Sequence, residues 1–153
     1  MKGRTTSLLC WMLLFVLYPA LSAASEPQAC SPEQLKVITT PGSSIQTLSK
    51  QQLLTIFTMK RTFWSDGSPI HVFVLPSNSS LHQQFSEQYL SMFPYQLSRI
   101  WYRQVFSGAG QAPTRVKTGS DMLQKVATTP GAIGYACLTT PRMAEEVDHV
   151  TID

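Results

Sequence analysis

The side chains best suited to chemistry in this sequence are the hydroxyls and the amide at Ser77, Asn78, Ser79 and Ser80. They follow an apolar run over residues 70–75 with the β-branched and aromatic content of a buried strand. Helical periodicity follows them, so they stand at a helix start, where unpaired N–H groups and a partial positive charge favour anions. We therefore predict an oxyanion site at these four residues. Ordinary helix capping is the alternative explanation of the same residues.

A second, weaker candidate of the same kind lies at Thr118, Gly119 and Ser120, which also precede a helical pattern. The other reactive residue types point to little chemistry. The histidines His71, His82 and His149 are scattered without metal-binding spacing. No metal site and no cofactor are therefore expected.

Nucleophilic catalysis also has little support in the sequence. There is no Gly-x-Ser-x-Gly nucleophile elbow. Cys137 closes an apolar run, and cysteines buried in apolar surroundings are usually inert. We therefore expect a protein that is not an enzyme.

Strands and helices alternate along the chain. Ser49 with Gln52 forms a capping box, and Pro94 suits the first turn of another helix. The patterns predict strands over 35–38, 70–75, 132–136 and 147–152, and helices starting at Ser49, Asn78, Pro94 and Thr118. This alternation favours one α/β domain with a largely parallel sheet.

The first residues have the pattern of a targeting signal. Lys2 and Arg4 precede an apolar run over residues 8–17, and small residues follow at 20–24. This order is typical of a cleaved secretory signal, and the run is short of the roughly 20 residues that a membrane anchor needs. We expect a signal peptide over 1–24 and a single mature domain over 25–153, with no membrane insertion after cleavage.

Charge and cysteine content narrow the possible partners. The formal net charge is +3, and the first 24 residues contribute two bases and no acid. A mature chain this close to neutral predicts no nucleic acid as partner. Cleavage would remove Cys10 and leave Cys30 and Cys137, which either form a disulfide in an oxidising compartment or remain two separate thiols.

Short motifs occur in a characteristic order: Leu48-Ser49, Gln52-Leu53, Ile56-Phe57, Trp64 to Ile70, Phe85, Trp101, Phe106-Ser107-Gly108 and Pro130 to Tyr135. Together they resemble the phosphate-binding periplasmic solute-binding protein family, and in particular its short exported members described as phosphate ABC transporter substrate-binding proteins. The resemblance spans residues 35–138. It implies one lobe of a type 2 periplasmic-binding-protein-like fold, with a central, mostly parallel sheet flanked by helices.

The resemblance also implies where a ligand would bind. The family holds phosphate through Arg, Ser, Gly and Thr of one segment. Ser79 falls on the Ser position, Ser80 on the Gly, Leu81 on the Thr and Leu75 on the Arg. One of the four ligand residue types is kept and the cation is absent, which predicts weak binding.

Two functions follow as expectations. The first is a periplasmic, non-enzymatic binding protein that holds phosphate or another small oxyanion weakly, working with a membrane transporter or sensor protein or with a second copy. The second is a protein-interaction accessory of a membrane sensor or transporter with no small ligand. Exposure of Trp64, Trp101 or Tyr102 would favour the second.

Overall fold

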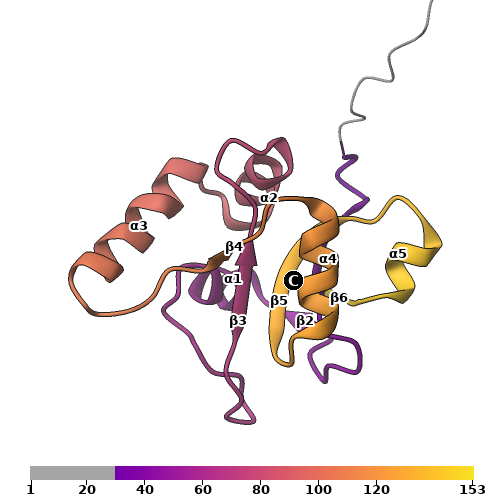
Figure 1. Ribbon diagram of the computed structural model, residues 1–153, viewed down its shortest axis with the longest axis horizontal. Helices are drawn as coiled ribbons and strands as arrows, with labels where there is room; N and C mark the ends of the chain where they lie inside the picture. The colour runs from indigo at the N-terminus through magenta and orange to yellow at the C-terminus, as the bar shows by residue number, and fades with distance from the viewer. Residues whose placement is uncertain (1–29) are drawn as a thin grey trace, which may run out of the picture.

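A six-stranded sheet forms the centre of the protein in the computed structural model, which describes residues 30–153 (Figure 1). The strands lie in the order β2-β6-β1-β5-β3-β4 across the sheet. Their bounds are β1 Leu35–Thr39, β2 Thr47–Leu48, β3 His71–Val74, β4 Thr114–Arg115, β5 Ala132–Cys137 and β6 Asp148–Ile152. The helices are α1 Lys50–Phe57, α2 Ser80–Leu90, α3 Pro94–Phe106, α4 Gly119–Thr128 and α5 Pro141–Glu145. The expected signal peptide lies outside the described residues.

The sheet is mixed, with three parallel and two antiparallel pairings among the described strands. β3 runs parallel to both β4 and β5, and β2 runs parallel to β6. Both antiparallel pairings belong to β1, which lies between β5 and β6. The α/β fold with a helix-flanked central sheet is therefore as predicted, and the direction of β1 is a detail that element order along the chain does not reveal.

The predicted strands and helices are confirmed, including the capping box in which Ser49 and Gln52 exchange hydrogen bonds at the start of α1. Three elements are additional. β2 and β4 have two residues each, which is too short to show periodicity. α5 buries none of its side chains, so it has no apolar face that a pattern would reveal.

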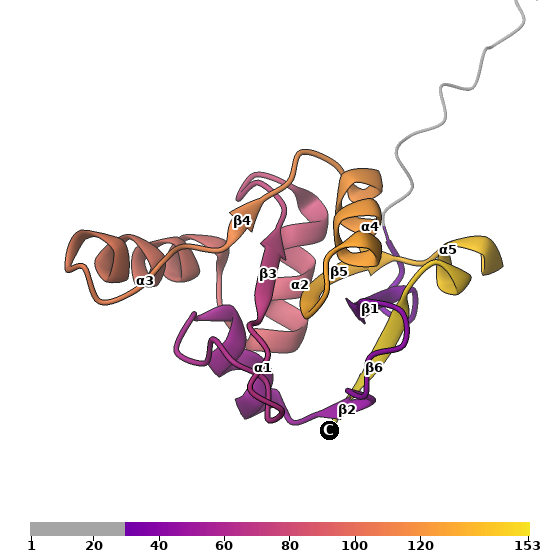
Figure 2. The same cartoon turned by 60° about the horizontal axis from the view of Figure 1, so that its bottom comes forward.

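Alternation along β5 assigns the helices to the two faces of the sheet. Gly134 faces α4, since a Cβ at this glycine would meet the side chains of Met122 and Val126. The next residue, Tyr135, points the opposite way and stacks on Phe85 of α2, with ring centroids 4.0 Å apart. Phe57 of α1 packs on Phe85 with centroids 4.7 Å apart, so α1 and α2 cover that second face (Figure 2).

A hydrogen-bonded chain crosses the buried side of the sheet at Tyr135. The backbone N–H of Leu75 donates to the Tyr135 hydroxyl at 2.8 Å, and that hydroxyl lies 2.6 Å from Nδ1 of His82. The tautomer of neutral His82 decides which of Nδ1 and the Tyr135 hydroxyl donates in this bond, and Nε2 has no partner among the described residues. Burial, followed by the nearby Arg115 charge, lowers the pKa of His82 to about 4.

This histidine makes stability depend on pH. The unfolded chain takes up the imidazole proton below about pH 6.5, and the folded protein does so only below about pH 4. The contribution is therefore complete above pH 6.5 and lost as the pH falls from 6.5 to 4, by about 3 kcal/mol. We expect the urea concentration at the unfolding midpoint to fall as the pH is lowered across this window. The His82→Asn variant should show a flatter dependence of the midpoint on pH. His149→Asn, at an exposed histidine, should leave the slope unchanged; equal slopes in all three proteins would contradict the assignment.

The turn before β5 depends on a glycine. Gly131 has a φ of +71°, and its carbonyl accepts from the Trp64 indole at 3.0 Å and from the His71 N–H at 3.1 Å. A Cβ at Gly131 would collide with the carbonyl oxygen of Pro69. Backbone conformation and lack of space therefore both require glycine at this position.

We expect Gly131→Ala to lower the free energy of unfolding by about 3 kcal/mol or more, measured by urea unfolding with tryptophan fluorescence. Gly67→Ala is the matched control, because Gly67 has a φ of +85° but open space around it. The control substitution should lower the free energy of unfolding by only about 1–2 kcal/mol, which is the cost of placing alanine in the left-handed backbone conformation. Equal losses would show that the contact with Pro69 carries no weight.

Candidate functional site

The loop that carries the first predicted site joins the carboxyl end of β3 to α2. Ser79 is the N-cap of α2, and its side chain accepts from the His82 N–H at 3.5 Å. The Ser79 N–H donates to the Pro76 carbonyl at 2.9 Å, which closes the turn. Ser77 points elsewhere, since its Oγ lies 3.3 Å from Oγ of Ser98 on α3.

The structure brings parts of the two predicted oxyanion sites to one cavity of about 660 Å³. Ser80 lines it from the start of α2, and Gly119 and Ser120 line it from the start of α4. Ser77, Asn78, Ser79 and Thr118 do not line it. Both helices follow strands that run parallel to each other, so both N-termini open at the carboxyl edge of the sheet.

Unpaired backbone donors gather at this cavity. The N–H groups of Ser80, Leu81, Gly119 and Ser120 have no acceptor among the described residues, and all four residues line the cavity. The next donors in each helix are already used, because Ser79 accepts from His82 and Thr118 accepts from Asp121 at 3.1 Å. Helix capping and oxyanion binding would therefore use different N–H groups of the same two helices.

The two helix starts differ in charge. Asp121 lies in the first turn of α4, and its carboxylate accepts from the Thr118 N–H at 3.1 Å, which completes a capping box. That negative charge offsets the positive end of the α4 dipole. α2 has no acid in its first turn. An anion in the cavity is therefore favoured on the α2 side.

No cation lines this cavity among the described residues. The position that the resemblance gives to an arginine is held by Leu75, which is buried and bonded through its N–H to Tyr135. A charged clamp is therefore absent from this part of the site, and neutral donors alone face a ligand.

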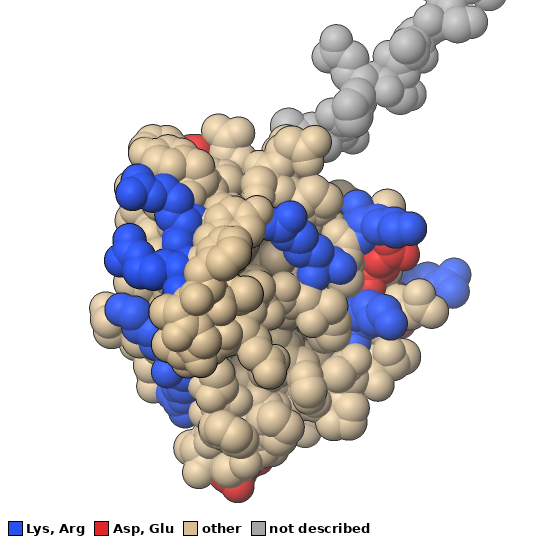
Figure 3. Space-filling model, turned by 60° about the vertical axis from the view of Figure 1, so that its left-hand side comes forward, with Lys and Arg blue, Asp and Glu red and all other residues tan. Residues whose placement is uncertain are grey.

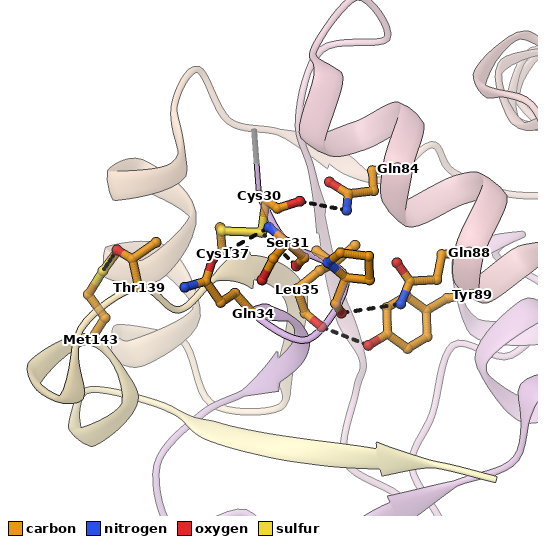
Figure 4. Close-up of a disulfide and its surroundings, with 11 residues drawn as sticks. Cys30, Ser31, Gln34, Leu35, Gln84, Gln88, Tyr89, Cys137, Thr139 and Met143 are labelled. Atoms are coloured by element: carbon orange, nitrogen blue, oxygen red, sulfur yellow. Dashed lines mark hydrogen bonds between the residues drawn. A yellow bond between two sulfur atoms is a disulfide. The ribbon is translucent and has the colours of Figure 1, made fainter. Parts of the chain in front are cut away.

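The rest of the cavity wall is mostly apolar and includes sulfur, and Gln84 and Thr139 are its polar side chains. Leu81, Leu123 and Met143 line it together with Cys30 and Cys137, which are joined in a disulfide with Cα atoms 5.8 Å apart. Figure 4 shows this disulfide beside α2, where Gln84 donates to the Cys30 carbonyl at 2.8 Å. Tyr89 of α2 donates to the Leu35 carbonyl at 2.7 Å, so polar contacts also hold this segment against the helix.

Sequence reasoning separated two sites that the fold joins. A signal was available for the first site only, because α2 follows the predicted strand over 70–75 and ligands bind at the carboxyl ends of such strands. The strand before α4 is β4, which is too short to show periodicity. The apolar wall had no comparable signal. Met143 belongs to the short helix α5, and its place at the cavity depends on tertiary structure alone.

Residues 30–153 contain no cluster of three or more His, Cys, Asp or Glu side chains that would hold a metal ion. Within the same range, no helix has the length and apolar content that crossing a bilayer requires.

The fold is that of a single lobe of a periplasmic binding protein. Similar solved structures are an ABC-type phosphate transport receptor from Vibrio cholerae (14% identity, TM-score 0.58) and a putative phosphate ABC transporter substrate-binding protein with bound phosphate from Clostridium perfringens (18% identity, TM-score 0.60). A third is a possible phosphate binding protein from Planctomyces limnophilus (18% identity, TM-score 0.59). This chain thus resembles the phosphate-binding receptors in fold, as its motifs implied.

The likeness covers 78% of this chain, but 46%, 45% and 41% of those three structures respectively. The chain therefore spans less than half of their length. No protein-family model and no curated protein matches the sequence.

The disulfide is open to a direct test. The two cysteines are 107 positions apart, and closing a loop of that size stabilises the folded state by about 4–5 kcal/mol in the chain-entropy model. We expect no free thiol in the denatured, unreduced protein of residues 25–153, and a loss of about 3–5 kcal/mol in the Cys30→Ser/Cys137→Ser variant. Two free thiols, or a variant as stable as the parent, would contradict the bridge.

Proposed function

We propose that this chain is an exported, periplasmic, non-enzymatic binding protein that holds phosphate or another small oxyanion weakly. The observation that carries the proposal is the set of four unpaired N–H groups, from Ser80, Leu81, Gly119 and Ser120, at one cavity. The fold shared with phosphate-binding receptors supports it. The expected signal peptide over residues 1–24 accounts for the export.

Weak binding follows from the donors. Each neutral hydrogen bond contributes about 0.5–1.5 kcal/mol net, and the cost of association must be subtracted. The cavity has no lining cation among the described residues, and Asp121 lies at one of its two helix starts. These terms suggest a binding free energy of about −4 kcal/mol, corresponding to a millimolar dissociation constant.

One lobe leaves one side of a bound ion in water. A second copy, or a membrane transporter or sensor protein placed over the cavity, would supply the missing cation and exclude water from the ion. We propose such a partner as the source of any tighter binding, because a charge-assisted bond is worth roughly twice a neutral one.

We expect phosphate to shift the backbone amide NMR signals of Ser80, Leu81, Gly119 and Ser120 in the mature protein, with half-saturation near millimolar. Ser80→Asp should abolish the shifts, since a carboxylate at the start of α2 occupies the positive helix end and repels the anion. Ser80→Asn is the matched control of similar size and no charge, and should keep them. Ser79→Ala should weaken them by loosening the cap.

Sulfate at equal ionic strength reports on ligand preference, and chloride controls for salt. Amides that stay unmoved at tens of millimolar phosphate would show that the serines serve only as helix caps. Equal shifts in the Asp and Asn variants would place the ion elsewhere.

The second candidate is a protein-interaction accessory of a membrane sensor or transporter. Trp64 and Trp101 are buried, but Tyr102 is 53% exposed, and other exposed aromatic residues accompany it on α3. An exposed aromatic group is the feature expected for a protein partner.

A further inference from the structure

Helix α3 projects from one end of the molecule and contacts the body along one side only (Figures 1 and 2). Leu97 and Trp101 are its buried side chains. The Trp101 indole donates to the Phe57 carbonyl at 2.8 Å, and Gln104 donates to the Thr58 carbonyl at 2.9 Å. These bonds attach the inner side of α3 to the end of α1 and fix which side of the helix faces solvent.

The outer side carries an aromatic stripe that contains an arginine. Tyr95, Arg99, Tyr102 and Phe106 follow one another at spacings of four, three and four residues, which places them on one helix face. The aromatic residues are 59%, 53% and 86% exposed, in that order. Phe93 stacks on Tyr95 with centroids 6.0 Å apart and extends the stripe. A contiguous aromatic face of this kind marks an interaction site.

Two hollows adjoin the stripe and share Ser98 and Tyr102. One, of about 560 Å³, lies between α2 and α3 and contains Arg99. The other, of about 240 Å³, lies towards β4 and contains Arg115. We call the two hollows and the aromatic stripe the α3 groove. It has room for protruding side chains at two points, each beside an arginine.

The charge around the α3 groove is positive. Between Glu87 and Asp121 the chain has four bases, Arg99, Arg103, Arg115 and Lys117, and no acid. Neither Arg99 nor Arg115 is in an ion pair or a side-chain hydrogen bond with another described residue. Glu87 lines the α2 wall and accepts from Gln83 at 3.0 Å. Figure 3 shows this end of the molecule, where basic side chains are prominent and acidic ones lie towards the margins.

We propose that the α3 groove binds an acidic, apolar-containing peptide segment of a partner protein. The free arginines are suited to pair with carboxylates, and the exposed aromatic residues are suited to pack against apolar side chains. A second copy is disfavoured because the same arginines would face each other. A flat membrane surface would leave both hollows unfilled. The inference rests on the interaction-module candidate and is independent of oxyanion binding.

The test begins with random 12-residue peptides displayed on phage and selected on the immobilised mature protein. We expect the selected peptides to combine Asp or Glu with aromatic or aliphatic residues. A selected peptide, synthesised with a fluorophore, should bind at least 10-fold more weakly to Tyr102→Ser and to Arg99→Ala/Arg115→Ala. Its affinity should also fall with added salt.

Phe63→Ser is the matched control, because Phe63 is 59% exposed but lines neither hollow. It should bind the peptide as the parent does. Arg99→Glu should lose the peptide and regain affinity for a version with one acid replaced by lysine, which a misfolded variant would not do. The phosphate-induced amide shifts should persist in Tyr102→Ser, so the two proposals succeed or fail separately.

Three results would overturn the inference. The first is that no acidic peptide is enriched, or that Phe63→Ser weakens binding as much as Tyr102→Ser does. The second is that the protein binds no peptide but sediments with phosphatidylglycerol vesicles, and that the Arg99→Ala/Arg115→Ala variant no longer does so. The third is a concentration-dependent dimer that Tyr102→Ser abolishes.

Discussion

The hydroxyl of Tyr135 holds together the end of the protein that carries the candidate site. It accepts from the N–H of Leu75, the residue that follows β3, and it shares a hydrogen bond with His82 in the first turn of α2. The loop with the candidate serines lies between these two partners. One buried hydroxyl on a central strand therefore fixes both flanks of that loop and sets the direction in which the N-terminus of α2 points. The stacking of the same ring on Phe85 fixes α2 against the sheet.

This arrangement also limits the chemistry of the site. Leu75 is part of the core, and a cation at its position would need burial beside a histidine that burial already keeps neutral. The protein therefore has donors at its cavity but no charged clamp among the lining residues that the structure describes. The helix starts contribute partial charges only, and Asp121 offsets one of them. Selectivity of such a site would rest on the geometry of N–H groups more than on charge.

Local patterns predicted the elements well because caps and periodicity are local. The Ser49 capping box, the entry to α2 and the strand containing Tyr135 all follow from residues within a few positions of each other. The order of short motifs from Leu48 to Tyr135 also led to the correct fold. The antiparallel direction of β1, the cavity shared by Ser80 and Ser120, and the position of Met143 in its wall depend on contacts between distant residues. A single sequence carries no direct signal for such contacts.

The exposed stripe on α3 is a further feature that local sequence patterns did not reveal. Helical periodicity grouped Leu97 and Trp101 with Ile100, Val105 and Phe106, but only Leu97 and Trp101 are buried. Val105 and Phe106 are exposed, so the pattern did not show which side of the helix faces the core. The bonds from Trp101 and Gln104 to the end of α1 decide the question. The loop after β3 then lies between two surfaces, since Ser77 contacts Ser98 on α3 while Ser80 faces the cavity. A partner bound along α3 would therefore lie near the loop at the proposed oxyanion site, where it could cover the ion that a single lobe would leave exposed.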